Sequence, residues 1–332
     1  VFVAGQTFGV LQGDKNAGNG DAFVREFDSA GNIVWTHQFG TAKNEAINGI
    51  AVDAVGAVYM GGLTESNLAI PYLGGGADAF VRKLDSRGNE VWTRQFGTSL
   101  GDQVRAVAVD ASGVYVAGMT NDALPGQTFA GLNDAFVRKY DSDGTEVWTR
   151  QFGTKETDTV LAIATDASGI YVAGSTSGSL TRQQLAGRTD VFVRKYDANG
   201  GELWTREFGT PGGDQASAVF ADGSAVSVAG YTEGALPREA SAGNDDGFVR
   251  KYDADGKELW TKQFGTTAID RTTAISGDRT SLYVVGRTDG AFSGQVFAGV
   301  SDVYVRKLNP SNGDEVWTRE FGSQFSDFAN GV

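Results

Sequence analysis

The stretch DAFVRKYDSDGTEVWTRQFG, from Asp134 to Gly153, decides the fold because it recurs with small changes along the whole chain. Within it, Ala135 to Tyr140 and Glu146 to Phe152 alternate aromatic or branched residues with polar ones, the period of a half-buried strand. Between them, Asp141 to Gly144 supplies a side-chain acceptor and a residue that tolerates positive φ. The stretch predicts two antiparallel strands joined by a tight turn.

The tryptophan of this stretch recurs at steps of 56 or 57 residues, as do its first aspartate and its last glycine. A regular period of this kind marks a propeller or a solenoid. The repeat units begin near Asp21, Asp78, Asp134, Asp190, Asp246 and Asp302, and the equivalent tryptophans are Trp35, Trp92, Trp148, Trp204, Trp260 and Trp317.

Each period contains four strand-like segments, named A to D in chain order; DQVRAVAVD, VYVAGMT, DAFVRKY and EVWTRQFG are one set. The A-to-B and C-to-D connections are tight, so an up-and-down meander places both at one edge. The longer B-to-C and D-to-A loops then share the opposite edge, the long-loop face. Strand A carries Gly or Ala at one fixed position, as expected for the innermost strand of a propeller blade.

The two ends of the chain predict ring closure. Val1 to Thr7 match strand B and Asp327 to Val332 match strand A, so strand A from the C-terminus would join strands B, C and D from the N-terminus. A solenoid would need atypical capping repeats, and none is visible. We predict an all-β, six-bladed β-propeller of four-stranded antiparallel blades, one domain over residues 1–332.

Composition excludes several function classes. A net charge of -13 and a pI near 4.6 argue against a nucleic-acid partner, which would need clustered Lys and Arg. The sequence contains no apolar run of 18 residues, so we predict no membrane insertion. The absence of cysteine excludes thiolate chemistry, and a single histidine excludes most zinc and Ser-His schemes.

The motif DAFVRKYDSDGTEVW, followed by FG, an acid before strand A and then VDASGVYVAGMT, resembles the SBBP β-propeller repeat of large bacterial surface and secreted proteins. The resemblance covers essentially the whole chain. It implies an exported protein, secreted or at the cell surface, with a binding or scaffolding role, and it brings no catalytic residues. The family name implies seven blades, whereas this chain closes at six.

Two recurring sets of acids are expected on the long-loop face. The C-strand acids are Asp21, Asp78, Asp134, Asp190, Asp246 and Asp302, and the A-strand acids are Glu45, Asp102, Asp158, Asp214, Asp270 and Asp327. The first set supplies candidate ligand-binding residues, and the second could hold a hard cation such as calcium at the channel mouth. Alternatively, each carboxylate accepts N–H groups of its own loop, which explains sixfold recurrence without an ion.

The tryptophans and arginines also have two interpretations each. The tryptophan could stack on a sugar, but packing between neighbouring blades is demanded of every repeat and is favoured. The strand C arginines are Arg25, Arg82, Arg138, Arg194, Arg250 and Arg306, and Arg94, Arg150, Arg206 and Arg319 lie on strand D. Pairing with acids of the same or next blade is favoured over an anion site.

Among the variable B-to-C loops, Phe8, Tyr72, Phe129, Leu185 and Phe297 either fold back onto the blades, which is favoured, or contact a partner. The predicted function is a non-catalytic binding or scaffold propeller that recognises a protein or glycan through its long-loop face. The alternative is a multivalent, lectin-like propeller, assisted by calcium, with sites between blades. A polysaccharide hydrolase or lyase is the second alternative and would need one asymmetric pocket.

Overall fold

The computed structural model describes residues 1–11, 13–69, 73–74 and 76–332. Within these ranges the chain forms 23 strands and no helix, which confirms the all-β prediction. No described segment forms a helix with the length and apolarity needed to cross a membrane. The chain divides into two compact units, Val1–Val160 and Leu161–Val332.

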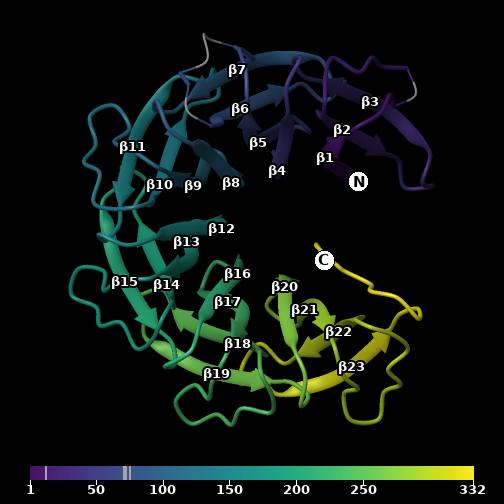
Figure 1. Ribbon diagram of the computed structural model, residues 1–332, viewed down its shortest axis with the longest axis vertical. Helices are drawn as coiled ribbons and strands as arrows, with labels where there is room; N and C mark the ends of the chain where they lie inside the picture. The colour runs from purple at the N-terminus through teal and green to yellow at the C-terminus, as the bar shows by residue number, and fades with distance from the viewer. Residues whose placement is uncertain (12, 70–72, 75) are drawn as a thin grey trace. The chain divides into compact units, whose positions relative to one another are not determined.

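The first unit contains three sheets, whose strands lie side by side in chain order (Figure 1). The first sheet has three strands, β1 (Phe2–Thr7), β2 (Asp21–Phe27) and β3 (Ile33–Phe39). The second is β4 (Glu45–Val52), β5 (Val58–Thr64), β6 (Asp78–Leu84) and β7 (Glu90–Phe96). The third is β8 (Asp102–Asp110), β9 (Gly113–Thr120), β10 (Asp134–Tyr140) and β11 (Glu146–Phe152).

Three further four-stranded sheets follow, the first of which starts before the unit boundary. It consists of β12 (Asp158–Asp166), β13 (Gly169–Thr176), β14 (Asp190–Tyr196) and β15 (Glu202–Phe208). The next is β16 (Asp214–Ala221), β17 (Ala225–Thr232), β18 (Asp246–Asp253) and β19 (Glu258–Phe264). The last is β20 (Asp270–Gly277), β21 (Leu282–Thr288), β22 (Asp302–Leu308) and β23 (Glu315–Phe321). The predicted A-B-C-D meander is confirmed.

The hairpin turn between β10 and β11 forms as its sequence predicts. Asp141 N donates to Thr145 O at 2.9 Å, and Asp141 Oδ1 accepts the amides of Asp143 and Thr145. Gly144 has φ 76°, and a Cβ there would lie 2.7 Å from the ring of Trp92. Glycine is therefore required both by the turn and by the indole that packs on it.

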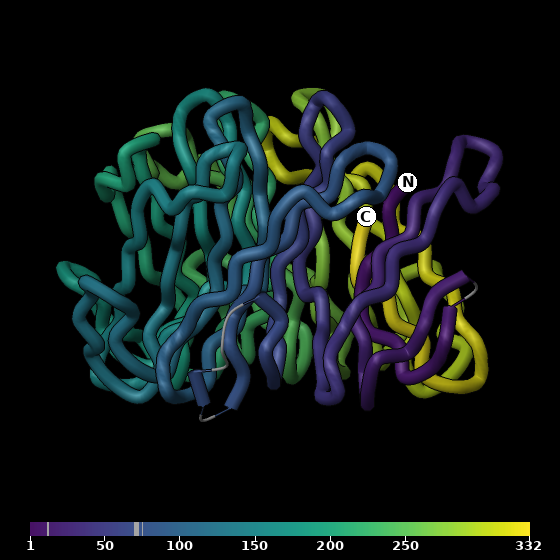
Figure 2. The backbone as a smooth tube through the Cα atoms, turned by 90° about the horizontal axis from the view of Figure 1, so that it is seen from above, coloured from purple at the N-terminus to yellow at the C-terminus, as the bar shows by residue number. Residues whose placement is uncertain are grey.

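The meander separates two kinds of connection. In the first unit, coloured purple to teal, the chain runs back and forth between two opposite edges (Figure 2). The turns β8–β9 and β10–β11 span only a few residues, whereas the segment between β9 and β10 covers residues 121–133. Because strand direction alternates, the long connections of a unit gather at one edge.

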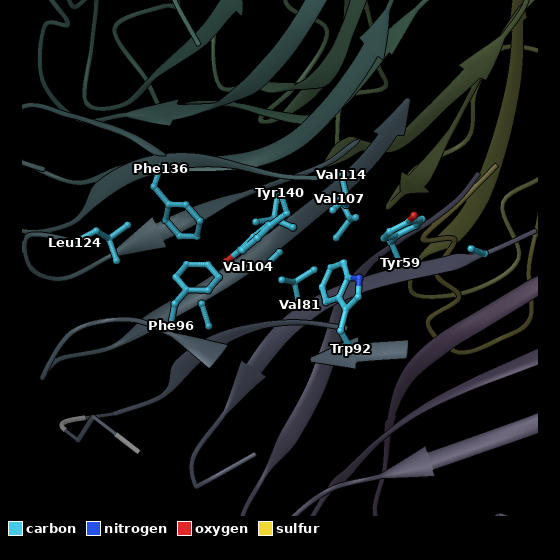
Figure 3. Packing of buried hydrophobic residues seen from close by; sticks show 13 residues of the cluster. Tyr59, Val81, Trp92, Phe96, Val104, Val107, Val114, Leu124, Phe136 and Tyr140 are labelled. Carbon is cyan, nitrogen blue, oxygen red and sulfur yellow. The ribbon is translucent and has the colours of Figure 1, made fainter. Parts of the chain in front are cut away.

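Buried aromatic side chains join neighbouring sheets of the first unit (Figure 3). Trp92 of β7 lies 6.2 Å from Tyr140 of β10, and Phe96 meets Phe136 edge to face at 5.6 Å, all between ring centroids. Trp92 is 7% exposed. Burying a side chain of this size contributes about 2–3 kcal/mol.

In β7, two polar side chains donate hydrogen bonds to the turn of the next repeat. Trp92 Nε1 donates to Ser142 O at 3.0 Å, and Arg94 Nε donates to Gly144 O at 2.7 Å. The equivalent indole bonds of Trp204 and Trp260 end on the carbonyls of Ala254 and Pro310. Each acceptor is a backbone oxygen.

The C-terminal segment Asp327–Val332 does not form the predicted strand, and the first sheet has three strands in place of four. The segment nevertheless runs where a first strand would run in its own unit. Thr273, at the bulge of β20, donates to Ala329 O at 2.6 Å. Asn48, at the bulge of β4, donates to the equivalent carbonyl of Val104 in β8 at 2.8 Å.

Candidate functional site

The C-strand acids lie at the first residue of β2, β6, β10, β14, β18 and β22, and all are fully buried. Asp134 Oδ2 accepts the amide of Ala130 at 2.9 Å, and so fixes the end of its own B-to-C loop. It also accepts the side-chain amide of Gln151 at 2.9 Å. These carboxylates organise the loops, as the structural interpretation of their recurrence expects.

The A-strand acids are held in the same manner by the loop that precedes them. Asp102 Oδ2 accepts the amide of Thr98 at 2.6 Å and its hydroxyl at 2.9 Å, and Glu45 accepts the equivalent pair from Thr41. Burial raises the pKa of Asp102, Asp214 and Asp270, opposed by hydrogen bonds from threonines. Asp327 is half-buried and accepts hydrogen bonds from the amide and the hydroxyl of Ser323.

The two acid sets meet on either side of the repeated glycine. A Cβ on Gly153 would lie 2.5 Å from Asp134 Oδ1 and 2.9 Å from Asp158 Oδ2. Only a hydrogen side chain leaves room for both carboxylates. Among the described residues, no group of three or more His, Asp or Glu side chains is arranged to hold a metal ion.

The glutamine that bonds the C-strand acid escaped the sequence analysis. Gln38, Gln95, Gln151 and Gln263 each donate to that acid at 2.7–2.9 Å. Glutamates stand at the two remaining positions, 207 and 320, where a carboxylate oxygen replaces the donor. The change from QFG to EFG at these two positions is the sequence signal that could have revealed this pair.

Glu320 shows the consequence of that replacement. Its Oε2 accepts the amide of Phe292 at 2.9 Å, as the glutamine oxygen does elsewhere, whereas its Oε1 is buried without a hydrogen-bond partner. Burial, followed by the charges of Asp302 and Asp270, raises the pKa of Glu320. Burial likewise raises the pKa of Asp190, the C-strand acid of the repeat whose β15 carries Glu207.

The strand C arginine Arg82 lies between two sheets of the first unit, where it packs on an aromatic ring and faces an acid. Arg82 is 5% exposed, and its guanidinium carbon lies 3.7 Å from the centroid of the Phe39 ring. Its Nη1 lies 3.4 Å from Glu90 of the same sheet. Burial lowers the pKa of Arg82 to about 10, so it stays charged at neutral pH.

The apolar residues of the B-to-C loops differ in exposure. Phe129, Leu185 and Phe297 are half-buried, whereas Phe8 is 75% exposed. Tyr72 lies outside the described residues. Other exposed apolar side chains stand at this edge of their own units, namely Val10, Leu73, Leu100, Leu132, Val296, Val300 and Phe325.

Two further cavities were not predicted from the sequence. One of about 560 Å³ lies at the short turns of the first unit and is lined by residues that include Tyr59, Asp110 and Asp141. A groove of about 870 Å³ in the second unit follows β15 and is lined by residues that include Arg182 and Trp204. Neither cavity is lined by any of the acids predicted for a site.

Comparison with known proteins places these repeats among β-propellers. Residues 91–124 match the β-propeller repeat SBBP, which confirms the resemblance stated above. The regulatory protein FlaEY of Caulobacter vibrioides is 25% identical over 353 residues, a match that covers 93% of this chain. This chain spans 37% of the length of that relative.

Solved structures share the fold at low identity. A quinohemoprotein alcohol dehydrogenase from Comamonas testosteroni matches 84% of this chain and 44% of its own, with a TM-score of 0.50 and 15% identity. A proposed 6-phosphogluconolactonase from Bacteroides uniformis matches 97% of this chain and 84% of its own, with a TM-score of 0.50 and 14% identity.

The second half of the chain gives the widest family match, over residues 133–328. That match extends over more than half of the sequence and includes every sheet of the second unit. The chain therefore belongs to the PQQ_2 family, described as outer membrane protein assembly factor BamB, and it carries the SBBP β-propeller repeat.

Proposed function

We propose that this chain is a non-catalytic binding or scaffold propeller of an exported bacterial protein, with the long-loop face as its recognition surface. The observation that carries the proposal is the exposure of large apolar side chains on loops that buried carboxylates hold. Leu132 is 63% exposed in a loop fixed by Asp134, and Val300 is 62% exposed in a loop fixed by Asp302. Exposed apolar surface on a rigid support is typical of a protein-binding surface.

The absence of catalysis is part of the proposal. The buried acids that could serve a hydrolase accept loop amides, and the same arrangement recurs from repeat to repeat. The relative from Caulobacter vibrioides is a regulatory protein by name. The SBBP match and the resemblance to bacterial surface proteins support export.

Site-specific photocrosslinking in the cell envelope tests the surface. A photoreactive residue at Leu132 or Val300 is expected to form a discrete adduct, whereas the same residue at Asp143, exposed in a short turn, is the matched control. Adducts from the Asp143 position alone would contradict the proposal.

We further propose that six blades close through Asp327–Val332 as the fourth strand of the first sheet. The three-stranded first sheet and the bond from Thr273 to Ala329 support it. Deletion of residues 327–332 is expected to lower the melting temperature, and a synthetic peptide of that sequence should restore it. An unchanged melting temperature after the deletion would contradict closure.

A further inference from the structure

Two arginines in the second unit adopt a backbone conformation that normally belongs to glycine. Arg182 has φ 64° and Arg238 has φ 72°, and no other non-glycine residue in the described part of the chain has positive φ. At the equivalent positions, Gly13, Gly126 and Gly294 have φ between 73° and 94°. A side chain at such a site strains the backbone. Two repeats nevertheless carry arginine there, which indicates a role other than forming the turn.

Each of these arginines lines a groove beside an end strand. The groove at Arg182 follows β15 and has a volume of about 870 Å³; the groove at Arg238 follows β19 and has about 540 Å³. Both volumes lie within the range of small-ligand sites. The same repeat positions line both grooves: Arg182, Trp204 and Arg206 of the first correspond to Arg238, Trp260 and Lys262 of the second.

The first groove is lined by three cations, Arg182, Lys195 and Arg206, and by two carboxylates, Glu202 and Asp255, so its lining is net positive although the protein as a whole is acidic. Arg206 donates only to the carbonyls of Thr205, Asp255 and Gly256, and Arg182 makes no ion pair among the described residues. Glu202 is already paired with Arg194 at 3.5 Å. An anionic group is therefore the ligand chemistry that the groove favours.

The second groove repeats this arrangement with weaker charge. Arg238 makes no ion pair among the described residues, and Glu258 is paired with Arg250 at 3.6 Å. Lys262, at the place of Arg206, is paired with Asp314 at 2.9 Å. The second groove should therefore bind the same ligand less tightly.

The floor of the grooves indicates which anionic ligand fits. Leu203 and Leu259 are 52% and 50% exposed and offer an apolar contact for the C–H face of a sugar ring. The indole of Trp204 is 8% exposed, so the tryptophan itself is not available for stacking.

An acidic peptide fits less well, because such a peptide would normally add as a strand to the free edge of β15 or β19. That edge is blocked at one amide in each strand. Gln183 Oε1 accepts the amide of Glu207 at 3.0 Å, and Glu239 Oε2 accepts that of Gln263 at 3.1 Å. The loop that carries each arginine thus occupies the position that a peptide strand would take.

From these observations we propose that the grooves at Arg182 and Arg238 bind an acidic saccharide, with the arginines contacting its carboxylates. The proposal adds a site that the proposed function does not include: a B-to-C loop forms one side of each groove, and the outer end strand forms the other. Two equivalent grooves one repeat apart suit a ligand with repeated anionic groups.

The decisive variants are R182G and R238G, because they separate binding from folding. Glycine relieves the backbone strain, so each variant should melt about 1–3 °C higher than the parent chain. Calorimetric titration with a short oligogalacturonate should show about tenfold weaker binding at the altered groove, since one charge-assisted contact is lost. A higher melting temperature with weaker binding is the expected combination.

The controls distinguish the outcomes. An uncharged oligosaccharide of equal length should not bind. Unchanged oligogalacturonate affinity in the R182G/R238G double variant would overturn the proposal, as would a lower melting temperature, which would show that the arginines serve the fold. Tighter binding of a polyglutamate peptide would overturn the saccharide assignment. Photocrosslinking at Leu132 reports on the long-loop surface independently.

Discussion

At the scale of the residue, Glu320 departs from the repeat. It places an acid opposite Asp302, where most repeats have a glutamine that donates a hydrogen bond. We expect E320Q to be more stable than the parent chain by about 1 kcal/mol at pH 7, because a hydrogen bond replaces a repulsion. The folded pKa of Glu320 is raised, so the parent chain loses stability as the pH rises through that pKa, and the difference should vanish near pH 4. Urea unfolding from pH 4 to pH 7 measures it.

The reverse change supplies the control. Q263E places the same acid opposite Asp246, where Gln263 now donates at 2.7 Å. It should create a second loss of stability over the same pH range. If the free energy of unfolding depends on pH in the same way for E320Q and the parent chain, Glu320 and Asp302 do not repel each other as proposed.

A buried ion pair gives the opposite pH dependence. Lys251 Nζ lies 2.9 Å from Asp222 Oδ2, and both side chains are at most 8% exposed. Although burial opposes ionisation, bonds from Ser224 and Lys251 lower the pKa of Asp222 to about 2. This stabilisation is present above about pH 4 and is lost as the pH falls towards 2.

We therefore expect D222N to lower the free energy of unfolding by about 2 kcal/mol at neutral pH. The difference from the parent chain should shrink below pH 4. D143N, in an exposed turn, should change stability by less than about 0.5 kcal/mol and serves as the control for denaturant titration.

At the scale of the element, the period-2 pattern and the turn residues predicted the strands closely. Strand β11 has the predicted bounds Glu146–Phe152, and β10 begins one residue before the predicted Ala135–Tyr140. The pattern could not predict the grooves, because they depend on how a B-to-C loop folds over an end strand. Nor could it show the φ of Arg182, which only backbone geometry reveals.

The contact between neighbouring sheets depends on the tryptophan of each end strand. Substitution W92A is expected to lower the free energy of unfolding by about 3–5 kcal/mol, since it opens a cavity beside Tyr59 and Tyr140. V91A, on the 53% exposed neighbour, should have an effect within about 0.5 kcal/mol. Equal losses in the two variants would show that the indole does not hold the sheets together.

At the scale of the whole molecule, the recurring acids offer a test of calcium binding. Each buried carboxylate accepts amides of its own loop, as Asp102 and Asp134 show. We expect the melting temperature to be the same in calcium and in chelator. A calcium-dependent rise would show that the two acid sets bind an ion where they meet beside Gly153.

The tryptophan bond to a backbone carbonyl also bears on how such a chain changes over generations. Because Trp92, Trp204 and Trp260 bond to the oxygens of a serine, an alanine and a proline, the contact depends on the path of the turn and not on its side chains. Turn residues can drift without loss of the contact. A repeat unit of this kind can then be duplicated or exchanged within the gene, since the turns that meet Trp92, Trp204 and Trp260 all present a backbone carbonyl to the indole.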